Sequence, residues 1–107
     1  MLAKSLLGTV LALGLAAGLA AAQVYPNPLN PDKGETLHIA DVKAGDRMTV
    51  YNVAGESVYA ATLSGNPSLD FWDCLNSNGV QVVTGVYFVV ISGSAEVYRV
   101  AVVRDKR

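Results

Sequence analysis

His38 is the only histidine in the 107-residue chain, and it lies between Leu37 and Ile39. If this stretch is a strand, alternation places the imidazole on the face opposite these two apolar side chains. A hydrolytic Ser–His–Asp arrangement also needs a serine held beside the imidazole, and nothing in the sequence places one there. We therefore expect His38 to be a surface side chain and not a catalytic base.

The residues that could bind a metal ion, Asp, Asn, Cys and His, are not spaced as they are in known metal sites. One Cys and one His cannot form the clusters that zinc prefers. The stretches 30–32 and 73–78 hold Asp and Asn oxygens suited to Ca²⁺, but their spacing differs from the D-x-D-x-D-G loop. The simpler interpretation is turn chemistry, in which Asp73 and Asn76 accept hydrogen bonds from the nearby backbone. We expect no metal and no cofactor.

Cys74 is the only cysteine, so no disulfide can form within the chain. A single cysteine in an exported protein can be buried, free or bridged to a second chain. Cys74 is therefore a candidate for an intermolecular disulfide, with burial as the structural alternative. The sequence also shows no converging carboxylates and no glycine-rich phosphate loop before a helix, so we expect a protein without catalytic activity.

Residues 1–22 have the pattern of a secretory signal peptide. They contain one charge, Lys4, and seven leucines, and they end in three alanines. A basic start, an apolar middle and small residues at the end are typical of a cleaved leader. An uncleaved anchor is the alternative, because residues 5–22 carry no charge and are barely long enough to span a bilayer. We expect cleavage, an exported protein and no membrane span after cleavage.

The 85 residues that follow the leader have the composition of a β-protein. They contain 15 valines against five leucines, and seven basic against nine acidic residues. β-Branched residues suit a pleated, half-buried surface. Clustered Lys and Arg are missing, which excludes a basic nucleic-acid binder. The length allows one domain.

Turn residues divide this part into an arm and a series of short strands. Three prolines make residues 23–34 an extended arm, which we expect to pair at a sheet edge through Val24 and Tyr25. Residues 35–107 form the domain proper, and Asn78-Gly79 predicts a type I′ turn. An unbroken apolar run at residues 86–91 is typical of a central strand. The expected strands are residues 35–42, 47–53, 57–63, 69–73, 80–83, 85–92 and 95–103. Their number and even spacing predict an all-β, Ig-like antiparallel β-sandwich of about seven strands.

Five motifs in order make this stretch resemble a known family. The chain is similar to the Ig-like domain of the flagellar hook-capping protein and to the type A C-terminal sorting domain of the type IX, or Por, secretion system. The resemblance covers about 80 residues. Its motifs are V-Y-P-N-P at residues 24–28, V-Y-N-V-A-G-E-S-V at 50–58, W-D at 72–73, N-S-N-G at 76–79 and T-G-V-Y-F-V at 84–89.

The resemblance implies a fold, a set of core positions and a role. It implies a β-sandwich whose structural core includes Val50, Val58, Trp72, Tyr87 and Val89. The family usually has W-D-G where this chain has W-D-C, so a thiol stands where glycine is expected. In that family, the sorting domain lies at the C-terminus of a large exported protein and is recognised by the outer-membrane translocon. In this chain the leader runs straight into the domain.

Together these observations predict a secreted module that acts in export and surface targeting through protein–protein recognition. Its partner would be a secretion translocon or an envelope assembly. Its location would be the bacterial periplasm, the outer-membrane surface or the extracellular space. Two alternatives remain open. One is a structural or self-assembling envelope subunit, which would form homo-oligomers, and the other is a small carbohydrate- or ligand-binding module.

Overall fold

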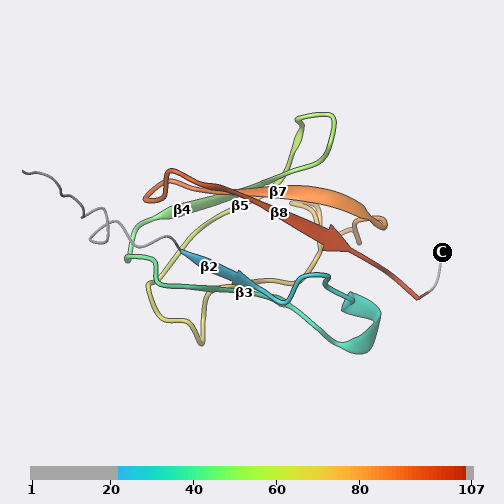
Figure 1. The fold of residues 1–107 in the computed structure, drawn as a ribbon, viewed down its shortest axis with the longest axis horizontal. Helices are drawn as coiled ribbons and strands as arrows, with labels where there is room; N and C mark the ends of the chain where they lie inside the picture. Colours follow the sequence, from blue (N-terminus) through green and yellow to red (C-terminus); the bar gives the residue numbers. More distant parts are fainter. Residues whose placement is uncertain (1–21, 106–107) are drawn as a thin grey trace, which may run out of the picture.

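The computed structural model describes residues 22–105, which form two packed antiparallel sheets (Figure 1). The all-β sandwich predicted from the sequence is confirmed. The predicted leader lies outside the described residues, except for Ala22. No helix among residues 22–105 has the length and apolar character needed to cross a membrane.

One sheet has three strands and the other has four. The three-stranded sheet has the order β2 (Gln23–Tyr25), β3 (Leu37–Ala40) and β6 (Phe71–Trp72). The four-stranded sheet has the order β5 (Ser57–Thr62), β4 (Arg47–Tyr51), β7 (Gly85–Ile91) and β8 (Val97–Val102). A short 3-10 helix, η1 (Pro31–Lys33), follows the arm. β7 is central, as its unbroken apolar run predicts.

The core fills the space between the sheets, and Trp72 is its largest fully buried side chain. Its indole lies edge-on to the Tyr87 ring, with centroids 5.8 Å apart, and its Nε1 donates a hydrogen bond to the carbonyl of Leu75 at 2.8 Å. Val50 and Val89 are also fully buried. Of the five positions that the resemblance implies, Val58 alone is only half-buried.

The proline-rich arm joins the two sheets. β2 pairs with β3 through Val24 and Tyr25, so the predicted edge pairing is confirmed. The chain then crosses to the four-stranded sheet, where the fully buried Leu29 forms a bridge to Val102. The Leu29 N–H donates to the carbonyl of Ala101, and its carbonyl accepts from the Val103 N–H, both at 2.8 Å. The arm therefore covers the outer edge of β8. At the opposite edge of this sheet, the Ser77 N–H donates a hydrogen bond to the carbonyl of Val58 on β5 at 2.9 Å.

The predicted strand at residues 80–83 and the type I′ turn before it are both wrong. Residues 80–83 make only an isolated bridge between Gln81 and Leu75. In the turn, Gly79 has a positive φ of 79° whereas Asn78 does not, and a type I′ turn needs both. The side chain of Asn76 closes this turn instead, because its Oδ1 accepts from the N–H groups of Asn78 and Val80.

Candidate interaction surfaces

His38 lies on the outer face of the three-stranded sheet, within a row of rings. Its cross-strand neighbours are Tyr25 on β2 and Phe71 on β6, each about 45% exposed. The imidazole stacks on the Tyr25 ring, with centroids 5.5 Å apart and planes at 27°. The side chain of Thr36 approaches its Nε2 at 3.5 Å, and no serine or carboxylate of residues 22–105 bonds to the ring. His38 is a surface side chain, as predicted.

The loops at residues 30–32 and 73–78, which hold the possible Ca²⁺ ligands, use their side-chain oxygens in turns. Asp73 Oδ1 accepts from the N–H of Leu75 at 3.3 Å, and Asn76 closes the turn described above. Turn chemistry at Asp73 and Asn76 is thereby confirmed. Asp32 forms an ion pair with Arg104 at 3.0 Å. Within residues 22–105, no three His, Cys, Asp or Glu side chains group closely enough to hold a metal ion.

Cys74 is fully buried and has an unusual backbone conformation. Its φ of 64° lies in the left-handed region, which glycine adopts without steric cost. This is the position where the resembling family has glycine. Burial raises the pKa of the thiol to about 11, while the Arg104 charge lowers it and the Asp73 charge raises it by smaller amounts. In the folded chain the thiol is inside, so an intermolecular disulfide would require this loop to open first.

Arg104 anchors the end of the chain, a role that the sequence did not indicate. Its Nε donates to the carbonyl of Val82 at 2.7 Å, and its backbone N–H donates to Thr84 Oγ1 at 3.0 Å. With the ion pair to Asp32, these bonds connect β8, the 82–84 loop and η1. The sequence indicated only a charged tail, because partners 20 or more residues away leave no local signal.

Asp70 is a second structural residue that the sequence did not reveal. Its side chain is almost fully buried and accepts three hydrogen bonds, from the N–H and hydroxyl of Ser64 and from the N–H of Gly65. These bonds hold the loop before β6. Gly65 has a φ of 86°, and a Cβ there would lie 2.9 Å from the backbone N of Ala44. In the sequence, this loop is marked only by Ser64-Gly65 shortly before Asp70, and that spacing does not predict a buried carboxylate.

A groove of about 350 Å³ opens between β5 and the segment around β6. Leu69 lies on its wall and is largely exposed. The lining residues are Tyr59, Ala61, Thr62, Leu63, Leu69, Asp70, Phe71 and Asp73. The groove therefore lies beside the edge strand β5.

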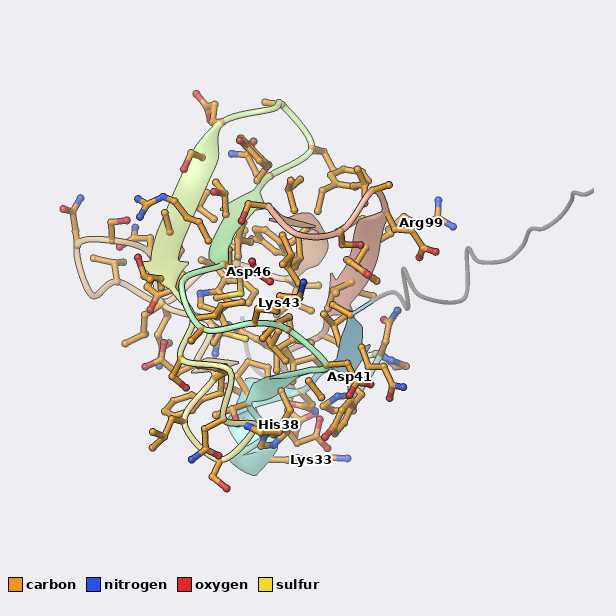
Figure 2. The ribbon with its side chains drawn as sticks, turned by 90° about the vertical axis from the view of Figure 1, so that its left-hand side faces the viewer. Lys33, His38, Asp41, Lys43, Asp46 and Arg99 are labelled. Atoms are coloured by element: carbon orange, nitrogen blue, oxygen red, sulfur yellow. The ribbon has the colours of Figure 1, made fainter. Side chains whose placement is uncertain are left out.

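The outer face of the four-stranded sheet carries a run of apolar side chains along β7. In β7, Tyr87, Val89 and Ile91 point into the core, so Val86, Phe88 and Val90 point outward. All three outward side chains are half-exposed. Figure 2 views the sandwich from one end, with His38 and Lys33 on the side of the three-stranded sheet and Arg99 projecting sideways from the region of β8.

Comparison with known proteins supports the fold. The first structure is PorZ, described as an essential bacterial surface component of the type IX secretion system of *Porphyromonas gingivalis*; the match has 30% identity and a TM-score of 0.65. It covers 85% of this chain and 12% of PorZ. The second is dimeric latent PorU from the same organism, with 19% identity, a TM-score of 0.55, and coverage of 78% of this chain and 9% of PorU.

These comparisons relate the chain to one part of much longer proteins. No family model matches the chain, and a search of curated proteins finds no match either. The likeness to PorU shows the fold alone, because the identity is low. The chain thus has a fold that also occurs in two Por proteins, one of them a type IX secretion component.

Proposed function

We propose that this chain is a secreted, non-catalytic module that acts in type IX secretion, where a protein partner recognises it during export and surface targeting. The similarity to PorZ supports the proposal most strongly, because it extends over 85% of this chain at 30% identity. The proposed location, outside the cytoplasm, agrees with the description of PorZ as a bacterial surface component.

The geometry of the reactive side chains favours recognition over catalysis. The His38 ring is exposed and stacked on Tyr25. The Cys74 thiol is buried, and burial raises its pKa to about 11, so it stays protonated and unreactive near neutral pH. The carboxylate of Asp70 is engaged by three donors of its own loop. These observations support the proposal of a module without catalytic activity.

A reporter fusion tests the proposal. Residues 1–22, a reporter and residues 23–107 would be joined in that order and expressed in *P. gingivalis* and in a strain without PorZ. We expect the reporter to reach the cell surface, where added protease degrades it in intact cells, only in the strain that has PorZ. A fusion that ends after the reporter serves as the control and should stay in the periplasm. Equal periplasmic retention of both fusions would contradict the proposal.

A further inference from the structure

The outer edge of β8 has a sequence that favours pairing with a further strand. β8 reads V-Y-R-V-A-V, with one charge, no proline and no glycine. Short segments of this kind add strands from other chains when their backbone groups are free at a sheet edge. Because β8 ends the order of the four-stranded sheet, its outward N–H and C=O groups need other partners.

Residues 27–30 of the arm occupy this edge, and we call them the edge cap. The N–H of Leu29 donates to the carbonyl of Ala101, and its carbonyl accepts from the N–H of Val103, both at 2.8 Å. Leu29 therefore takes the place of a residue in a neighbouring strand.

Asn27 extends this ladder with its side chain. Its Nδ2 donates to the carbonyl of Arg99 at 2.9 Å, and its Oδ1 accepts from the N–H of Ala101 at 3.0 Å. A carboxamide can replace a strand residue in this way because it carries both a donor and an acceptor. Packing accounts for the fully buried Leu29, but Asn27 is exposed, so its two bonds to β8 are the contribution that its side chain makes.

The edge cap offers no N–H to a further strand after Asn27. Pro28 has no N–H, and that of Leu29 is bound to β8. The N–H of Asn30 donates to Glu35 Oε1 at 2.7 Å, and the carbonyl of Asn30 accepts from the N–H groups of Lys33 and Glu35. The cap thus satisfies the edge of β8 without creating a new edge that could pair in its turn.

We propose that residues 27–30 form an edge cap that keeps β8 from pairing with β8 of a second copy of this chain. The two groups that Asn27 covers, the Arg99 carbonyl and the Ala101 N–H, are complementary to each other. In an antiparallel pair with Arg99 opposite Ala101 of the other copy, each carbonyl would meet an N–H, and no like charges would be opposed. The inference goes beyond the proposed function and does not depend on it.

Asn27→Ala opens this part of the edge, and sedimentation velocity measures the result. The chain would be produced with residues 1–22 and purified after export. We expect the variant to form dimers or larger species at a protein concentration at least tenfold lower than the unaltered chain needs. A folded variant that sediments like the unaltered chain at every concentration would overturn the inference.

Asn52→Ala is the matched control. The Asn52 side chain makes three hydrogen bonds, to the N–H groups of Ala54 and Glu56 and to Glu56 Oε1, but it lies in the turn between β4 and β5. Its loss should leave the sedimentation of the chain unchanged. If Asn52→Ala associates as strongly as Asn27→Ala does, reduced stability and not the open edge is the cause, and the edge cap is wrong.

A second substitution on β8 tests where the copies meet. Val97 is 61% exposed, so Val97→Lys adds a charge to the edge strand with little change in packing. Charges on an edge strand oppose pairing. Added to Asn27→Ala, it should restore the monomer without changing the melting temperature. Undiminished association of the double variant would overturn pairing through β8.

A milder variant keeps the test decisive if Asn27→Ala does not fold. Asn27→Asp retains the acceptor for the Ala101 N–H but cannot donate to the Arg99 carbonyl. It should associate at a concentration at least threefold lower than the unaltered chain, and unchanged sedimentation would contradict the edge cap. No secretion partner takes part in these measurements, so the edge cap can fail while the proposed function holds, and the reverse.

Discussion

The two sides of β7 carry similar apolar side chains but differ in how deeply these are buried. Tyr87, Val89 and Ile91 face the three-stranded sheet and are buried. Val86, Phe88 and Val90 face outward and stay half-exposed. Burial of the inner side contributes more to the stability of the fold than the outer side does, because the outer side chains remain partly in contact with solvent. The contrast teaches that apolar composition alone does not distinguish residues that fold this module from residues available to a partner.

The largest expected effect comes from the core residue opposite β7. Trp72→Ala should lower the free energy of unfolding by about 3–5 kcal/mol, because the cavity would lie against Tyr87 in a small core. Such a loss is comparable to the whole stability of many small domains. Urea denaturation followed by circular dichroism measures it. A loss below about 1 kcal/mol would show that the buried Trp72 side chain contributes little to folding.

The same substitution at two adjacent positions compares the sides directly. Val89→Thr buries a hydroxyl in the core and should cost about 1–3 kcal/mol. Val90→Thr places the hydroxyl at the outer surface and should cost less than about 0.5 kcal/mol. Denaturant midpoints of the two variants provide the comparison. Equal losses would mean that the outer side is as important for folding as the inner side.

A glycine pair tests the loop that leads into β6 beneath the core. Gly65 and Gly34 both have a φ above 80°, but only at Gly65 would a Cβ meet backbone, 2.9 Å from the Ala44 nitrogen. Gly34→Ala should therefore cost about 1 kcal/mol, and Gly65→Ala about 1 kcal/mol more. Thermal unfolding of both variants measures the difference. Identical melting temperatures would show that this close approach is not required.

The buried thiol predicts how the inner side responds to pH. The pKa of Cys74 rises from its ordinary value of 9.0 to about 11, mainly through burial. Well below pH 9 the thiol is protonated in both the folded and the unfolded state, so the full stability of the fold is present. Between pH 9 and 11 the thiol ionises mainly in the unfolded state, so the free energy of unfolding falls as the pH rises. At pH 10 the loss should be about 1 kcal/mol relative to pH 8.

Cys74→Ala isolates this contribution from other alkaline effects, including that of Tyr87, whose pKa burial also raises. The variant should lose less stability than the parent between pH 8 and 10. The native thiol should also react with an aromatic disulfide reagent at pH 8 much more slowly than the unfolded thiol does. Rapid reaction in the native state would place Cys74 at the surface.

Patterns of neighbouring residues predicted the strands well, because alternation and turn residues act over short distances. The central place of β7 follows from its apolar run, and the β4–β5 hairpin follows from two strands around the 52–56 turn. The strand prediction for residues 80–83 was wrong. Its valines favour strands, but they have no partner strand beside the turn that Asn76 closes. Local preference was weaker there than the available pairing.

Long-range contacts explain what the sequence did not indicate. Arg104 binds Asp32, which is 72 residues away, and burial of Cys74 depends on how the loop folds into the core. Alternation also separates the two sides of β7 without saying which one is inner. That choice depends on where β3 and β6 pack, and it determines which apolar residues of β7 are buried in the core.

The surface fraction of a reporter that carries residues 23–107 tests the account most directly. In P. gingivalis cells with PorZ, we predict that added protease degrades most of the exported reporter, whereas a reporter without residues 23–107 stays protected in the periplasm. A reporter that remains protected in the periplasm, with or without the module, would contradict recognition of this chain by the type IX system.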